Sequence, residues 1–199
     1  MIIDFLIIGT AKSKNKKQYY IKERWKIWGL LFYTNKIKEY WKNIDEFNNN
    51  ATQEFAQKNG FQFVDLLDGI FKNDSSFDLN NPKCIEDLKK NILLIKDSSV
   101  SNLIFNGKTA LSLFIMGNML LEGKDAKIED IKKLIKKYSY GKLDQTYFKD
   151  YIISSLNDKN VFLAPNTSSM SSSFDEFVWI DALTNIKKTK NEYKFNHVS

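Results

Sequence analysis

The sequence of 199 residues contains one cysteine and one histidine. With Cys84 alone, the chain can form neither an internal disulfide nor a cysteine-based zinc site, and we expect a reducing, cytoplasmic location. His197 lies close to the C-terminus and is the only imidazole. Its isolation excludes a Ser-His-Asp triad, a multi-histidine metal centre and most acid–base schemes that need histidine. We therefore expect no metal site.

The sequence also lacks a long hydrophobic run. Residues 1–8 are apolar, but they include Asp4 and are too few to span a bilayer. They have neither the basic flank nor the small-residue cleavage site of a signal peptide. This segment is typical of a buried strand, and we expect no membrane partner.

What the sequence does have is an excess of basic residues. Lys and Arg number 30 against 24 Asp and Glu, which gives a formal charge of +6 and a pI near 9.1. This excess fits a polyanionic partner such as nucleic acid, because Lys and Arg placed against phosphates release counterions. A general bias towards Lys and Asn would produce the same charge. Hydrophobic residues make up 43% of the chain, enough to bury a core.

Short apolar runs alternate with segments of helical period. Residues 2–8, 61–67, 100–105 and 161–164 are typical of buried parallel strands. Apolar residues follow the spacing of helices at 21–34, 85–95, 108–121, 128–138 and 174–186. This alternation predicts an α/β fold with a central, mostly parallel four-stranded sheet flanked by helices. No linker is apparent, so we expect a single domain over 1–199, with a frayed tail at 187–199.

A polar segment follows each predicted strand, at 9–13, 65–69, 106–108 and 165–171. In open α/β sheets, ligands bind beyond the carboxyl ends of the strands. We therefore expect four polar loops to open on one edge of the sheet and to form the functional site there.

The motifs in these segments follow a recognisable order. They are Gly9-Thr10-Ala11, with Tyr19-Tyr20 and a helix carrying Trp28 after it; the second strand with Asp65; Phe105-Asn106-Gly107-Lys108-Thr109-Ala110; and Pro165-Asn166-Thr167-Ser168, with Trp179 after it. Together they resemble the mismatch-specific and hypoxanthine-type branch of the uracil-DNA glycosylase superfamily. The resemblance spans most of the chain. It implies a uracil-DNA glycosylase-like fold and a monofunctional DNA N-glycosylase that acts as a monomer, without a cofactor, on double-stranded DNA with a flipped base.

The resemblance also assigns residues to the base. Tyr20 matches the aromatic residue that stacks on the flipped base, although it could instead pack a loop onto the next helix. Asp65 matches the residue that reads the polar edge of the base. An ionised aspartate only accepts hydrogen bonds, so it should prefer the amino group of a cytosine-type base to uracil. The alternative is an aspartate that caps a loop or pairs with a lysine. Ala11, Asn106 and Asn166 complete the expected base-binding residues.

The catalytic positions depart from the family pattern. Ala11 stands where family members carry the polar residue that positions water, and Trp25 stands where the hypoxanthine-type branch carries an asparagine. We therefore name Asp65, Glu23 and Asp68 as candidates to orient the water. The expected function is excision of a modified or damaged base, in repair or in defence against modified viral DNA. The alternative is a catalytically silent module that recognises modified DNA.

Two segments are expected to contact the DNA backbone. The first holds Lys12, Ser13, Lys14, Lys16 and Lys17, whose charges suit phosphates. The second holds Thr167, Ser168, Ser169, Met170 and Ser171, and it resembles the family loop that enters the minor groove. Met170 would fill the space that the flipped base leaves. A flexible serine-rich loop that caps the following helix is the alternative.

The first of these segments can be tested by charge removal. Changing Lys14, Lys16 and Lys17 together to Ala should weaken binding to every duplex alike and reduce its dependence on salt, because phosphate contacts carry no sequence information. Titrations at several salt concentrations measure both effects. An unchanged affinity and salt slope would mean that the lysines face solvent only.

Overall fold

A computed structural model describes residues 4–13, 60–71, 81–143, 156, 158–166, 178–179 and 181–182. The predicted helix at 21–34 and the predicted tail at 187–199 lie outside these residues. Of the predicted helix at 174–186, residues 178, 179, 181 and 182 are described, and these four are helical.

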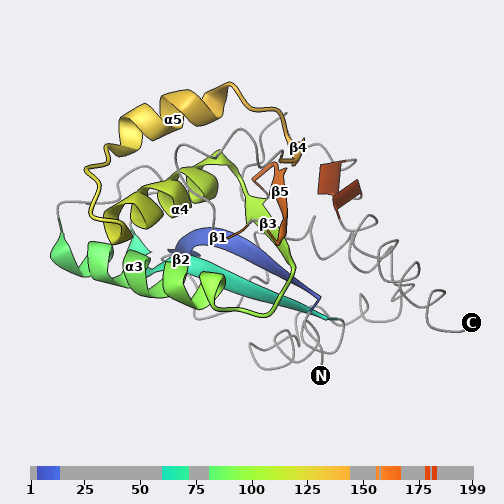
Figure 1. Cartoon of the computed structure of the whole chain (residues 1–199), viewed down its shortest axis with the longest axis horizontal. Coiled ribbons are helices and arrows are strands. Elements are labelled where there is room, and N and C mark those ends of the chain that lie inside the picture. The colour runs from blue at the N-terminus through green and yellow to red at the C-terminus, as the bar shows by residue number, and fades with distance from the viewer. Residues whose placement is uncertain are drawn as a thin grey trace, which may run out of the picture.

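The described residues form an α/β fold around a five-stranded sheet (Figure 1). Its strands are β1 (Phe5–Ser13), β2 (Phe61–Phe71), β3 (Asn102–Asn106), β4 (Gly141–Lys142) and β5 (Asn160–Ala164). They lie in the order β2-β1-β3-β5-β4. The first three neighbouring pairs in this order are parallel, and β4 is antiparallel to β5. The prediction of a mostly parallel sheet built on the four apolar runs is confirmed.

The predicted count of four strands was wrong because it missed β4. This strand has two residues, Gly141 and Lys142, which pair with Leu163 and Phe162. A segment this short has no alternation of polar and apolar residues, which is the signal by which a strand is recognised in a sequence. Its pairing with β5 continues where the backbone N–H of Leu143 donates to the carbonyl of Val161 at 2.8 Å.

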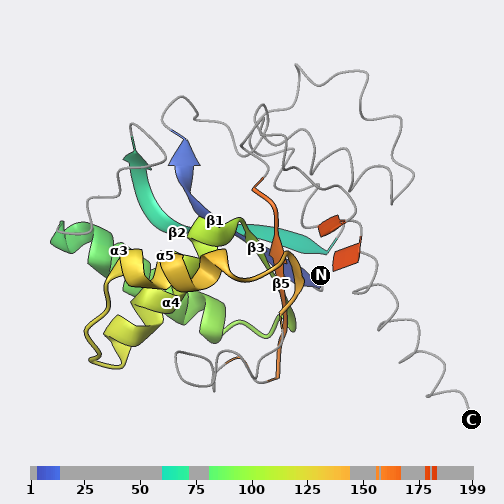
Figure 2. The same cartoon turned by 90° about the horizontal axis from the view of Figure 1, so that it is seen from above.

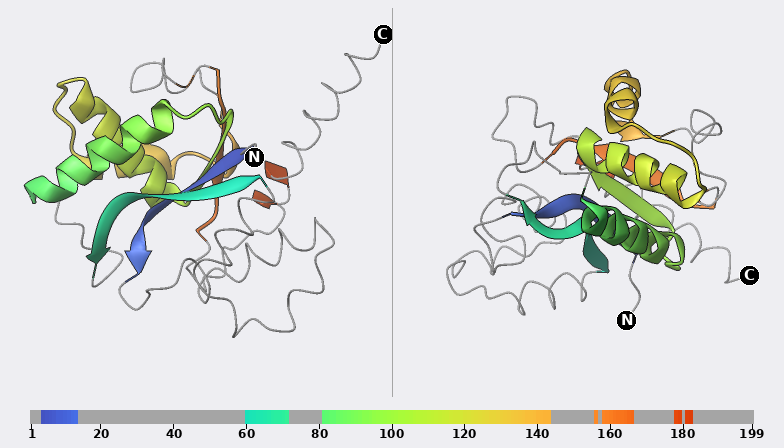
Figure 3. Two further views of the ribbon diagram at one scale, coloured as in Figure 1. Left: turned by 90° about the horizontal axis from the view of Figure 1, so that it is seen from below. Right: turned by 90° about the vertical axis from the view of Figure 1, so that its left-hand side faces the viewer.

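The ends of β1 and β2 were also predicted wrongly. We expected loops to begin at Gly9 and after Leu67, but β1 continues to Ser13 and β2 to Phe71. The two strands pair with each other over this extra length, with a register shift between Ala11 and Lys12. Backbone pairing satisfies their amides and carbonyls whatever the side chains are, so polar residues continue the strands. Figure 3 shows β1 and β2 bending together beyond the rest of the sheet.

Among the described residues, three helices cover one face of the sheet (Figures 1 and 2). They are α3 (Pro82–Lys96), α4 (Lys108–Leu121) and α5 (Ile128–Lys136). The bounds predicted for α4 are confirmed. Helix α3 begins earlier than predicted, because Asn81 caps it by accepting a hydrogen bond from the amide of Lys83 at 3.0 Å. In the part of the chain that the structure describes, no helix has the length and apolar character needed to cross a bilayer.

Both faces of the sheet are buried, as its parallel strands predict. On the helix-covered face, Leu6, Ile8, Leu103 and Phe105 pack with the helices, and the Phe105 ring meets the edge of Phe114 at 5.1 Å between centroids. The residues at the alternate positions of the strands point to the opposite face and are also buried. They are Phe5, Ile7, Phe63, Ile104 and Phe162.

Polar contacts join the strands at the N-terminal edge of the sheet. The side-chain amide of Asn102 donates to the backbone carbonyl of Asp4 at 2.8 Å. The side-chain amide of Asn160 donates to the side-chain oxygen of Asn102 at 3.1 Å. Lys159 is 6% exposed, and its ammonium donates to the carbonyls of Ser98 and Val100 at 2.6 and 3.0 Å. Side-chain hydrogen bonds, most of them to backbone carbonyls, therefore connect the strands at this end of the sheet.

A second polar group joins the C-terminal ends of α3 and α4. Lys96 donates to the side-chain oxygen of buried Asn118 at 2.9 Å, and the Asn118 amide donates to Glu122 at 3.1 Å. Glu122 also contacts Lys124 at 2.7 Å. The hydrogen bond from Lys124 is the main reason that the pKa of Glu122 lies below its ordinary value.

Gly117 of α4 lies directly against side chains of α3. A Cβ placed there would lie 2.3 Å from Cδ1 of Ile92 and 2.8 Å from Cγ of Leu88. Replacing a helix glycine by alanine gains about 1 kcal/mol of helix propensity, but overpacking costs typically about 1–3 kcal/mol. Gly117→Ala should therefore lower the free energy of unfolding in denaturant titrations. In an Ile92→Val background, which removes the Cδ1 atom nearest to the new methyl group, the loss should shrink. A stabilising Gly117→Ala would contradict this packing.

Candidate functional site

One row of residues crosses the sheet at the level where β3 and β5 reach their C-terminal ends, and β1 and β2 continue past this level to Ser13 and Phe71. Gly9 of β1 pairs with Asp65 of β2, and Asn106 of β3 pairs with Ala164 of β5. Ile8 pairs with Phe105, so Gly9 and Asn106 are the next residues of their two strands. The row therefore reads Asp65, Gly9, Asn106, Ala164 across four neighbouring strands.

This row lies on the face of the sheet opposite the three helices. Side chains alternate along a strand, and the residues just before the row, such as Ile8 and Phe105, pack with the helices. Two positions before the row, on its own face, stands a row of large apolar residues, namely Phe63, Ile7, Ile104 and Phe162. Along this face of the sheet, the bulky apolar side chains are thus followed by one carboxylate, one amide and two small residues.

Asp65 and Asn106 differ in burial. Asp65 is half-buried, whereas Asn106 is 3% exposed. Each takes part in a further interaction within the protein. Neighbouring strands lie about 4.8 Å apart, so the two backbones are separated by roughly 10 Å, with Gly9 between them. Because Gly9 has no side chain, nothing from β1 stands between the carboxylate and the amide at this level.

The turn after β3 brings Asn166 to the same edge. The amide of Gly107 donates to the carbonyl of Ala164 at 2.8 Å, which ties this turn to the end of β5. Gly107 has φ +95°, and a Cβ there would lie 2.9 Å from Cβ of Asn166. Trp179 is fully buried, and its Nε1 donates to the carbonyl of Pro165 at 3.0 Å, which anchors the same segment. Asn106 and Asn166 are therefore neighbours at the edge.

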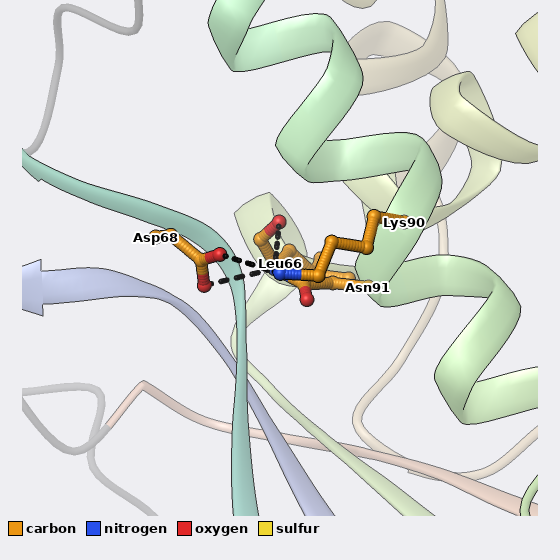
Figure 4. Close-up of polar contacts among 4 residues, drawn as sticks. All are labelled: Leu66, Asp68, Lys90 and Asn91. Atoms are coloured by element: carbon orange, nitrogen blue, oxygen red, sulfur yellow. Dashed lines mark hydrogen bonds and ion pairs between the residues drawn. The ribbon is translucent and has the colours of Figure 1, made fainter.

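Two other predicted site residues, Ala11 and Asp68, lie where β1 and β2 continue beyond their predicted ends. Ala11 lies within β1 opposite Leu67; Leu67 belongs to the hydrophobic core, and Ala11 is partly buried against that core. Asp68 is exposed, and its carboxylate accepts a hydrogen bond from the Asn91 amide at 3.1 Å and faces the Lys90 ammonium at 3.6 Å (Figure 4). The same Asn91 amide donates to the carbonyl of Leu66 at 3.2 Å. Asp68 thus holds β2 to α3.

The start of α4 is fixed from another direction. Its first residue, Lys108, donates from its ammonium to the carbonyl of Lys136 at the end of α5, at 3.0 Å. The same ammonium stands 5.2 Å from the centroid of the Tyr140 ring. This side chain joins α4 to α5.

The remaining predicted site residues are not placed by the structure. Lys12 and Ser13 belong to β1, but only their backbone is described. The others lie outside the described residues; they are Tyr20, Glu23, Lys14, Lys16, Lys17, Thr167, Ser168, Ser169, Met170 and Ser171. Among the residues that are described, no three His, Cys, Asp or Glu side chains gather as a metal ion would require.

Sequence reasoning named Asp65, Asn106 and Asn166 but missed the small residues beside them. Gly9 and Ala164 complete the row, and Trp179 fixes the segment that carries Asn166. A glycine or alanine at the end of an apolar run was visible in the sequence. Its place beside a particular carboxylate depends on strand register, which the sequence does not display.

Comparison of the chain with protein-family models and with curated proteins finds no match.

The turn between β3 and α4 can be tested with two glycines. Gly107 and Gly123 both have positive φ, but a Cβ at Gly123 would meet nothing within 4 Å. The φ +95°, ψ 157° of Gly107 is open essentially to glycine only, at a cost of about 1–3 kcal/mol for other residues. Gly107→Ala should therefore lower the free energy of unfolding by more than Gly123→Ala in denaturant titrations. Equal losses would mean that Asn166 does not crowd Gly107.

Proposed function

We propose that the protein is a DNA glycosylase of the uracil-DNA glycosylase type, which excises a modified or damaged base from double-stranded DNA. The observation that carries the proposal is the row at the C-terminal edge, in which Asp65 and Asn106 flank Gly9 on one face of the sheet. Ligands of open parallel sheets bind at this edge. Gly9, Asp65, Asn106 and Asn166, which belong to the motifs that resemble the superfamily, lie near this level of the sheet, and this supports a uracil-DNA glycosylase-like fold.

The row suits the edge of a flat heterocycle. A flipped base is read through hydrogen bonds to its polar edge, while its faces stack on apolar or aromatic side chains. Asp65 supplies an acceptor, and Asn106 supplies both donors and an acceptor. Small residues at Gly9 and Ala164 let a ring approach the backbone. Tyr20 is the residue proposed to stack on the base.

Base excision breaks the bond between the anomeric carbon of deoxyribose and the base nitrogen. The bond electrons leave with the base while positive charge develops on the sugar, and water adds to the anomeric carbon and loses a proton. Donors directed at the departing base stabilise its negative charge, and a carboxylate orients the water. Glu23 is the preferred carboxylate for the water, because Asp65 is proposed to contact the polar edge of the base, on the side of the ring away from the anomeric carbon, and Asp68 is bound to Asn91 and Lys90.

A catalytically silent module that recognises modified DNA is the second candidate. It is favoured by Ala11, which stands at the water-positioning place of the family and is partly buried against the hydrophobic core. A methyl group in that position can neither orient nor deprotonate water.

Either candidate would act as a monomer in the cytoplasm, as a single domain without a cofactor. The biological setting would be DNA repair or defence against viruses with modified DNA. In both candidates the lysines of the 12–17 segment and the hydroxyl-rich segment after Asn166 would grip the phosphates that flank the flipped base.

The experiment that separates the two candidates is an excision assay. Duplexes that each carry one uracil, mismatched cytosine or modified cytosine are incubated with the protein, and abasic sites are then cleaved with alkali. Strand cleavage at one class of base supports the glycosylase. Selective binding without cleavage supports the silent module, and neither selective binding nor cleavage would contradict both.

The same duplexes test the role of Asp65. An ionised carboxylate that faces uracil O4 places two hydrogen-bond acceptors against each other, and neither is satisfied. An unpaired buried polar group costs about 1–3 kcal/mol, or roughly tenfold in discrimination between bases. Wild-type protein should therefore favour cytosine-type bases, and Asp65→Asn should shift the preference about tenfold towards uracil. Asp97→Asn makes the same charge change at the exposed end of α3 and should leave the preference unchanged. A wild-type preference for uracil would show that Asp65 does not read the base.

A further inference from the structure

The row at the edge places an amide where a second hydrogen bond to the same ligand can form. In the strand register, Gly9 on β1 lies between Asp65 on β2 and Asn106 on β3. By strand alternation both side chains emerge from the same face and level of the sheet. A planar ligand edge that reaches Asp65 over Gly9 is therefore directed towards Asn106.

Asn106 is held in place by its neighbours. It is the last residue of β3, it pairs with Ala164, and it is 3% exposed. The amide of the next residue, Gly107, donates to the carbonyl of Ala164 at 2.8 Å and to that of Phe105 at 3.1 Å. A buried side chain on a backbone held in this way loses little freedom when it binds, which favours a positional role. Its amide has two donor hydrogens and an acceptor oxygen, so it can bind more than one partner at a time.

We infer that Asn106 is a second specificity-determining residue, which donates a hydrogen bond to the ring nitrogen beside the amino group that Asp65 accepts. This inference rests on the proposed function. It names the substrate class as bases with an amino group next to an unprotonated ring nitrogen. Cytosine has this pair at N4 and N3, and adenine has it at N6 and N1.

Uracil, guanine and hypoxanthine carry the reverse pair, a carbonyl beside a ring N–H. Against these bases the Asp65 carboxylate meets a carbonyl oxygen, while Asn106 can still rotate to accept from the N–H. Asp65 therefore rejects the carbonyl, and Asn106 accounts for affinity at the neighbouring ring atom. The two residues have different roles, and variants of Asn106 and Asp65 should change the preference in different ways.

The test replaces the donor by an acceptor. In Asn106→Asp, a carboxylate would face cytosine N3, which is also an acceptor, whereas uracil N3–H could still donate to it. The ratio of affinities for duplexes with mismatched cytosine and mismatched uracil should fall about tenfold or more. Because both affinities come from one preparation, the ratio does not depend on the folded fraction. Asn81→Asp makes the same change at the exposed cap of α3, where Asp caps as well as Asn, and should keep the wild-type ratio.

Asn106→Ala provides a second measurement if Asn106→Asp does not fold. It should reduce the affinity for the mismatched-cytosine duplex about tenfold relative to a duplex with a stable abasic-site analogue, which has no base to contact. A wild type that prefers cytosine, with variants that keep both ratios, overturns the inference and leaves the proposed function intact. A wild type that binds all duplexes alike and cleaves none overturns both.

Discussion

The parallel pairing of β1 with a strand on either side is the constraint on which the rest of the structure depends. Its register with β2 sets Gly9 beside Asp65, and its register with β3 sets Asn106 at the same level. A slip of one residue in either pairing would turn every side chain of the moved strand to the other face. Asp65 would then face the helices, and Phe63 would lose its place among the large apolar side chains of the opposite face. Burial of large side chains on both faces holds this register.

Local patterns in the sequence were enough to predict much of the fold. The apolar runs and the helical spacing at 108–121 gave the right elements because burial on both faces of a parallel sheet requires such runs. The elements that the sequence did not predict depend on pairing with strands far away in the chain. Gly141 and Lys142 form a strand only because β5 offers an edge, and the polar ends of β1 and β2 stay extended only because each pairs with the other.

The candidate site was likewise predicted only in part from local patterns. Motif order led to Asp65, Asn106 and Asn166, which the structure places along one edge of the sheet, with Asn106 and Asn166 adjacent. The same reasoning could not foresee that Asp68 contacts Asn91 and Lys90, residues more than twenty positions further along the chain. It also could not foresee that Gly9 separates the two polar side chains of the row. Register and helix placement decide both facts, and a single sequence encodes them only through the whole core.

Buried Lys159 has a consequence for chemical labelling of the protein. Its ammonium is enclosed and bound to the carbonyls of Ser98 and Val100, whereas Lys90 and Lys133 extend from the surface of α3 and α5. Amine-reactive reagents modify an unprotonated, accessible nitrogen, so they would label the surface lysines and spare Lys159 while the sheet is intact. Opening of the edge between β3 and β5 would expose it. The extent of its modification would then report the integrity of the sheet in the presence of many other reactive amines.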